Sequence, residues 1–96
     1  SLETTEELSV DHIIPCQYIW ERVDWTEDEW IKYYYDEDNC CLVKPSINSS
    51  KGCKGLSDWL PDNNIEWYCR KWKEISEKYN IPLDEEDEYI IKINSK

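Results

Sequence analysis

The sequence predicts a small α+β fold in which two short strands pair as an antiparallel hairpin and pack on a helix. Two short apolar runs predict the strands, because each run ends at a proline, which cannot donate to a ladder. Apolar side chains at three-and-four spacing between residues 65 and 79 predict the longest helix. A chain of 96 residues is expected to form one domain, near the lower size limit for a self-sufficient core.

The strands are expected on either side of a helical insertion. Residues 9–14 form the first strand and end at Pro15, and residues 40–44 form the second and end at Pro45. Between them, Thr26 is followed three positions later by a glutamate, which is the capping-box pattern of a helix start.

Helices are expected over the rest of the chain. Ser46 can cap a short helix, and Asn63 or Asn64 can cap the longest one, which ends at Tyr79. The acidic residues 84–88 suit the first turn of a last helix, where the helix dipole favours negative charge. The tryptophans of this half are expected in the core or in helix packing rather than as base-stacking platforms: Trp59, Trp67 and Trp72.

The net charge of −11 is unevenly distributed along the chain. It amounts to −10 over residues 1–39, +2 over residues 40–80 and −3 over residues 81–96. Affinity for nucleic acid comes mainly from neutralised phosphates, so the acidic N-terminal part predicts weak non-specific DNA binding. Capture of a nucleic-acid substrate would then depend on a partner domain or protein.

The five cysteines are an odd number, which does not suit a secreted disulfide framework. They are expected to be free thiols in a cytoplasmic protein. A structural Zn²⁺ is disfavoured because no C-x-x-C pair is present. No apolar run approaches the roughly 18 residues of a membrane span, so no membrane partner is expected.

One short stretch carries the candidate chemistry. His12 is the only histidine of the chain, and it follows Asp11 directly. Phosphodiester hydrolysis needs a group that takes a proton from water and a cation that stabilises developing charge. A neutral imidazole suits the first task, while a carboxylate and an amide oxygen, here Asp11 and Asn48, suit magnesium. Neighbours on a strand face opposite sides, so this site requires a distorted strand end.

Three further side chains have candidate roles beside ordinary ones. Asn39 is placed to brace the loop that carries His12, and it is also a common turn residue. Lys51 and Lys54 can hold a substrate phosphate, although lysines in such positions are often merely solvated.

The motif resembles the HNH endonuclease superfamily, which has the ββα-metal fold. The resemblance rests on Asp-His-Ile-Ile-Pro at residues 11–15, then Asp38-Asn39, Asn48, and a lysine three residues later. The continuation Asn-Ser-Ser-Lys-Gly-x-Lys-Gly-x-x-x-Trp-Leu-Pro, ending at Pro61, is similar to one branch. That branch is found in bacterial secreted nucleases and at the C-terminus of modification-dependent restriction enzymes.

The resemblance implies a division of roles among these residues. It implies His12 as general base, Asp11 and Asn48 as ligands of Mg²⁺ or Mn²⁺, and Asn39 as the brace. It also implies cleavage that leaves a 5′-phosphate and a 3′-hydroxyl. Three departures weigh against DNA capture by this chain alone: Cys40-Cys41 at the start of the second strand, the acidic insertion, and the absence of the upstream region common in this branch.

The sequence therefore predicts a metal-dependent DNA endonuclease domain with an HNH core at residues 9–61 and C-terminal helices at residues 62–95. The expected context is restriction, phage defence or phage DNA processing, with a bacterial or phage-encoded chain that belongs to, or works with, a larger protein. The alternative is a degenerate HNH fold whose acidic face mimics DNA and binds a basic partner protein.

Overall fold

Strand β1 (Ser9–His12) pairs antiparallel with strand β2 (Cys40–Val43) in the computed structural model, which describes residues 8–94. The register sets Asp11 opposite Cys41 and His12 opposite Cys40. This confirms the expected antiparallel pair. The first strand is shorter than expected, because it ends at His12 and the next two residues are buried in the core.

Two α-helices and a short 3-10 helix, η1 (Glu37–Asn39), fill the segment between the strands. Helix α2 (Glu27–Tyr34) begins at the expected capping box, in which Thr26 and Glu29 satisfy each other's backbone N–H groups. Helix α1 (Cys16–Trp20) was not expected from the sequence. It has no side-chain cap and begins directly after Pro15, so it carries none of the signals that marked the other helices.

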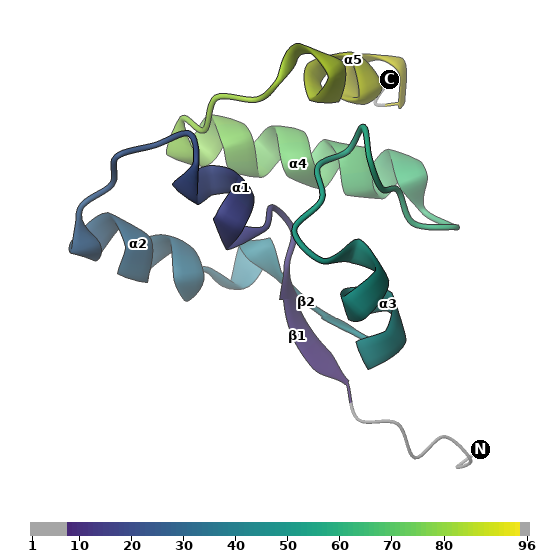
Figure 1. Cartoon of the computed structure of the whole chain (residues 1–96), viewed down its shortest axis with the longest axis horizontal. Coiled ribbons are helices and arrows are strands. Elements are labelled where there is room, and N and C mark those ends of the chain that lie inside the picture. Colours follow the sequence, from purple (N-terminus) through teal and green to yellow (C-terminus); the bar gives the residue numbers. More distant parts are fainter. Residues whose placement is uncertain (1–7, 95–96) are drawn as a thin grey trace.

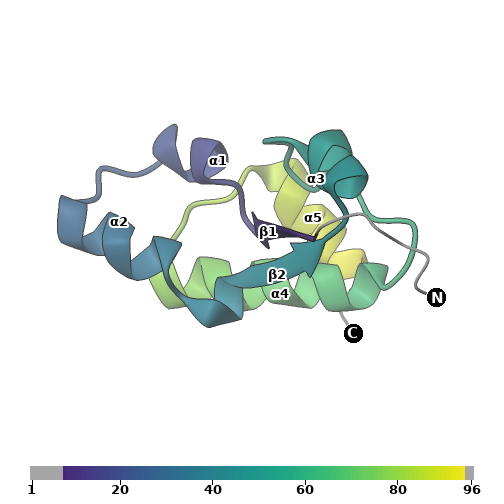
Figure 2. The ribbon, with the colours of Figure 1, turned by 90° about the horizontal axis from the view of Figure 1, so that it is seen from below.

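Three helices follow β2: α3 (Pro45–Lys51), α4 (Ile65–Tyr79) and α5 (Glu85–Asn94). The expected cap at Ser46 was wrong, because the cap is Lys44, two residues earlier, and α3 has proline at its first position. Helices α1 and α2 lie to one side of the hairpin and α3 lies to the other, while α5 packs on α4 (Figures 1 and 2). The result is a small α+β fold with a two-stranded sheet and five α-helices among residues 8–94.

The core lies between the hairpin, α1, α2 and α4. Its largest fully buried apolar side chains come from α1, α2, α4, the two residues after β1 and the loop after α3: Trp72, Tyr33, Ile13, Ile14, Ile19, Leu56 and Ile75. The expected core position of Trp72 is confirmed. The same expectation was wrong for Trp67, whose side chain is 44% exposed, and Trp59 is partly buried against the core.

The loop after α3 is fixed to α5 by a buried carboxylate. Asp87 is 1% exposed and accepts hydrogen bonds from the Tyr18 hydroxyl at 2.6 Å and from the backbone N–H of Ser57 at 2.8 Å. A Cβ at Gly55 would lie 2.9 Å from both Asp87 Oδ2 and Tyr18 Cε2, so the loop can approach this closely only with glycine there. This contact holds in place the loop that leads to Trp59.

The carboxylate of Asp36 is expected to contribute to the stability of the fold in a pH-dependent way. It accepts hydrogen bonds from Lys78 Nζ at 2.6 Å and from the Tyr79 hydroxyl. Burial raises the pKa of Asp36, but the hydrogen bonds from Lys78 and Tyr79 outweigh burial and hold that pKa below its ordinary value of 3.8. A carboxylate with a lowered folded-state pKa stabilises the fold above its unfolded pKa and loses that contribution as the pH falls through the folded value.

We therefore expect Asp36→Asn to lower the melting temperature by a few degrees at neutral pH, and this difference to shrink below pH 3.8. Thermal melts of both proteins across the acid range measure it. Asp38→Asn is the matched control, because Asp38 reaches Lys78 at 3.6 Å and is much more exposed. A difference that stays constant into strong acid would contradict the assignment.

Candidate functional site

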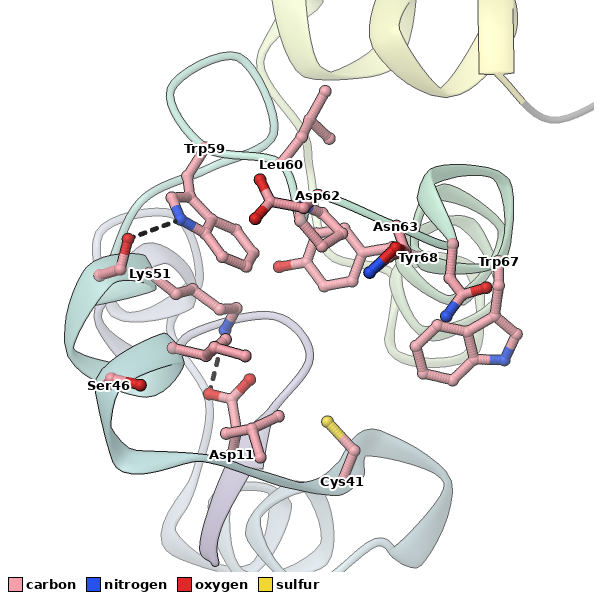
Figure 3. A pocket seen from close by; sticks show the side chains of 15 residues that line it. Asp11, Cys41, Ser46, Lys51, Trp59, Leu60, Asp62, Asn63, Trp67 and Tyr68 are labelled. Carbon is pink, nitrogen blue, oxygen red and sulfur yellow. Dashed lines mark hydrogen bonds and ion pairs between the residues drawn. The ribbon is translucent and has the colours of Figure 1, made fainter. Parts of the chain in front are cut away.

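The candidate site is built around a buried ion pair between β1 and α3. Lys51, the last residue of α3, is 2% exposed, and its Nζ lies 3.1 Å from Asp11 Oδ1 (Figure 3). The same ammonium donates to the His12 carbonyl oxygen at 2.8 Å. Lys51 was expected to contact a substrate phosphate. In the structure its ammonium instead forms an ion pair with Asp11, because the C-terminal end of α3 packs directly on β1.

Asp11 and Lys51 form part of the wall of a cavity of about 400 Å³. The cavity lies between the hairpin, α3, the segment that leads into α4 and the start of α4, and aromatic side chains from that segment and from α4 line much of it. Figure 3 shows Trp59 and Trp67 on opposite sides in this view, with the Asp62 carboxylate on the side of Trp59. Trp59 is fixed there by a hydrogen bond from its Nε1 to Ser50 Oγ at 3.1 Å.

His12 lies on the other face of the hairpin. Its Nε2 is 2.9 Å from the Tyr34 carbonyl oxygen, and its ring centroid is 4.6 Å from that of Tyr34. Val10, Tyr35 and Leu42 lie around it on an open, largely apolar surface. The ladder is regular here, so neighbouring side chains alternate between faces. The strand distortion that would bring Asp11 and His12 into one groove is not present.

The imidazole has a defined hydrogen-bonding arrangement. A carbonyl oxygen only accepts, so the contact with Tyr34 assigns the proton to Nε2 in the neutral ring. Nδ1 is then the unprotonated nitrogen, which is the form that can take a proton from water.

Asn39 braces the chain just beyond His12. Its side chain is fully buried, and its Oδ1 accepts from the backbone N–H of Ile14 at 3.5 Å. Its carbonyl oxygen accepts from the backbone N–H of Ile13 at 2.8 Å. These are backbone hydrogen bonds of the kind expected from the sequence, and they join the start of β2 to the end of β1.

The remaining candidate residues lie outside the cavity wall. Asn48 is half-buried on α3, one helical turn before Lys51, so it is on the same side of that helix without lining the cavity. Lys54 is exposed, and its ammonium donates to the Ser50 carbonyl oxygen at 3.2 Å. The structure therefore brings Asp11 and Lys51 together, and leaves His12, Asn48 and Lys54 apart from them.

Asp11 supplies a ligand type that suits a hard cation, although it is already paired with Lys51. Magnesium is commonly held by one or two carboxylates with several waters, and amide oxygens are acceptable partners. Asp11 Oδ1 already faces an ammonium, whereas its Oδ2 has no hydrogen bond within residues 8–94. No group of three His, Cys, Asp or Glu side chains in those residues could share one metal ion. Burial raises the pKa of the nearby Cys41 thiol and Asp11 raises it further, so Cys41 stays neutral.

Sequence reasoning did not identify the polar edge of this cavity. Asp62, Asn63 and Asn64 precede α4, and the sequence indicated only that one of the asparagines caps the helix. Asn64 does occupy the cap position, in a left-handed conformation, but its side chain makes no capping hydrogen bond. The signal available in the sequence was the adjacency of these three polar residues to Trp59 and Trp67.

Fold and site together define a small α+β protein with a largely apolar cavity, carrying a few polar groups, beside a two-stranded hairpin. No protein-family model, no curated protein and no solved structure matches the chain. Within residues 8–94, every helix is too short or too polar to cross a membrane.

Proposed function

We propose that the chain is a metal-dependent endonuclease domain of the HNH type, which hydrolyses DNA phosphodiester bonds. One observation carries the proposal: an antiparallel strand pair is followed directly by a helix whose C-terminal end packs on Asp11. This order of elements, together with the Asp11-His12 sequence and the asparagine on α3, is what a ββα-metal core requires. A restriction or phage-defence context is part of the same proposal.

In this proposal Asp11 and Asn48 hold the cation. A bound Mg²⁺ or Mn²⁺ would stabilise the charge that develops on the leaving oxygen. Asp11 is already oriented toward a positive charge, since it pairs with the Lys51 ammonium. Asn48 lies one turn before Lys51 on α3. A small rotation of α3 would therefore move the side chains of Asn48 and Lys51 together relative to Asp11 on β1.

His12 takes the proton from the attacking water. Its Nε2–H is held by the Tyr34 carbonyl, which leaves Nδ1 as the basic nitrogen. Asn39 limits how the chain after His12 can move, through its hydrogen bonds to Ile13 and Ile14. For base and cation to act on one phosphate, the end of β1 must twist so that His12 and Asp11 approach the same groove.

The charge distribution supports the proposal that another domain or protein captures the DNA. The first 39 residues carry −10, and the Lys51 ammonium is buried against Asp11 rather than presented to solvent. Phosphate neutralisation supplies most non-specific affinity for DNA, so this chain alone is expected to bind duplex DNA weakly. Lys54 is exposed and remains the candidate phosphate contact next to α3.

The test is nicking of supercoiled plasmid by the purified chain with Mg²⁺ or Mn²⁺. We expect nicked circles that appear with metal and vanish with EDTA. Asp11→Asn, purified in the same way, controls for contaminating nuclease, because it keeps the size of the side chain and removes its charge. Equal nicking by the wild-type chain and Asp11→Asn, or no nicking at high protein concentration with either metal, would overturn the proposal.

A second function is favoured by a specific surface. The first turn of α2 presents three acidic side chains, Glu27, Asp28 and Glu29, all exposed. With Lys51 neutralising Asp11, the fold needs no metal to be stable and can serve as an acidic module that occupies a basic partner's nucleic-acid site.

The acidic module has its own test. It predicts binding to a basic DNA-binding protein that His12→Ala leaves unchanged and that charge removal on α2 weakens. The substitutions Glu27→Gln, Asp28→Asn and Glu29→Gln suit this purpose, since glutamine preserves the capping box. If binding survives these substitutions, the acidic-module function is excluded.

A further inference from the structure

The cavity beside Asp11 has the composition of a site for a flat, partly polar ligand. Its volume of about 400 Å³ lies within the range of small-ligand pockets, which combine apolar walls with a few convergent polar groups. Trp59 and Tyr68 form one rigid part of the wall, with ring centroids 5.7 Å apart in an edge-to-face arrangement. Trp67 lies across from Trp59 in Figure 3.

Trp67 is not accounted for by packing. Its side chain is 44% exposed at the cavity, and within residues 8–94 it has no aromatic neighbour, although most other tryptophans of this chain do. Trp67 occupies an exposed position in the first turn of α4, where the fold does not require an aromatic ring. An indole face left open beside a cavity is available to stack on a planar ring.

Polar groups with unused hydrogen-bonding capacity line the same cavity as this indole. The side chains of Asp62, Asn63 and Asn64 form no hydrogen bond or ion pair within residues 8–94. Carboxamides offer a donor and an acceptor side by side, which matches the edges of nucleobases, and a carboxylate accepts from base amino groups. A ligand with both a planar ring and a polar edge fits this combination.

Charge decides which part of a nucleotide enters. Two carboxylates, Asp11 and Asp62, line the cavity, and the one lysine among the lining residues, Lys51, is already paired with Asp11. A phosphate inside would face uncompensated negative charge from Asp62. A nucleobase is neutral, so it can enter while its sugar and phosphates stay at the solvent side.

We propose that this cavity binds one unpaired nucleobase of a DNA strand, with the base stacked on Trp67 and its edge hydrogen-bonded by Asp62, Asn63 and Asn64. The inference rests on the proposed endonuclease function, because Asp11 forms the wall of the same cavity and the bound base would set the position of the adjacent phosphate. A base within an intact duplex is stacked on both sides and cannot enter. The site therefore selects single-stranded, mismatched or extruded nucleotides.

Binding without cleavage tests the inference. A fluorescein-labelled single strand of about 12 nucleotides, and the blunt duplex of the same sequence, are titrated with the full chain in EDTA at about 50 mM salt, with anisotropy as the readout. We expect tighter binding to the single strand than to the duplex. Trp67→Ala is expected to weaken single-strand binding by roughly 5- to 150-fold, and Trp67→Phe to retain most of it, since a phenyl ring still stacks.

Trp20→Ala is the matched control, because Trp20 is 67% exposed on α1 and does not line the cavity. It should leave binding unchanged, and circular dichroism checks that each variant is folded. The inference is overturned if Trp67→Ala binds like the wild-type chain or if the wild-type chain binds no single strand. It is also overturned if Trp67→Ala and Trp20→Ala lose affinity equally.

Plasmid nicking assays with Mg²⁺ keep this inference separate from the proposed function. Nicking without Trp67-dependent binding overturns the base site and leaves the endonuclease intact. Trp67-dependent binding without nicking supports the base site and contradicts the proposed endonuclease function.

Discussion

His12→Ala is expected to lower metal-dependent plasmid nicking by about 100- to 10,000-fold, the usual contribution of a general base. The chain contains no second histidine that could replace it. The substitution should leave the fold intact, because the side chain is only partly buried and its hydrogen bond and ring contacts within residues 8–94 involve only Tyr34 and Tyr33. Initial rates of supercoiled plasmid loss measure the effect, and thermal melts check the fold.

Cys40→Ser provides the matched control for His12→Ala. Cys40 is the cross-strand partner of His12, so it lies on the same face of the hairpin, yet it has no proposed role in proton transfer. We expect normal nicking by Cys40→Ser. If His12→Ala nicks normally while Asp11→Asn is inactive, then His12 stays on the outer face during the reaction and another group accepts the proton.

The regular elements of this fold were predictable where a local signal marks them. Pro15 and Pro45 mark the ends of the two strand regions, and the capping box at Thr26 begins a helix at the expected place. The three-and-four spacing of apolar residues gave α4, whose end at Tyr79 was also predicted. Helix α1 was missed because five residues without a cap depend on tertiary packing of Tyr18 and Ile19 rather than on local propensity.

The candidate site was only partly predictable, because its parts depend on which way side chains face. A bracing role was expected for Asn39, and its hydrogen bonds to Ile13 and Ile14 are of that kind. The burial of Lys51 was not expected, since a lysine two turns along a short polar helix reads as solvated until the packing of α3 on β1 is known. Neighbouring side chains on a regular strand were expected to point to opposite faces of the hairpin. The structure keeps that strand regular, so Asp11 and His12 are separated.

Lys51→Met is expected to destabilise the fold by about 3–5 kcal/mol, the usual result of removing one partner of a buried ion pair. Methionine preserves most of the apolar stem, so the loss comes mainly from the Asp11 carboxylate, which is left 8% exposed without a counter-charge. Denaturant unfolding measures the change. Lys54→Met should lie within about 0.5 kcal/mol of the wild-type chain, because Lys54 is exposed and bonds only a carbonyl oxygen in residues 8–94.

The double variant Asp11→Asn with Lys51→Met removes both charges and should be more stable than Lys51→Met alone, which separates charge from packing. The same pair tests whether a metal can take the place of the ammonium. If Asp11 is a metal ligand, about 10 mM Mg²⁺ should raise the stability of Lys51→Met more than that of the wild-type chain, because binding to the folded state alone is stabilising. The double variant should show no such gain. Equal effects of Mg²⁺ on the stability of all three proteins would exclude Asp11 as the cation site. A Lys51→Met chain as stable as the wild type would show that the ion pair between Asp11 and Lys51 does not stabilise the fold.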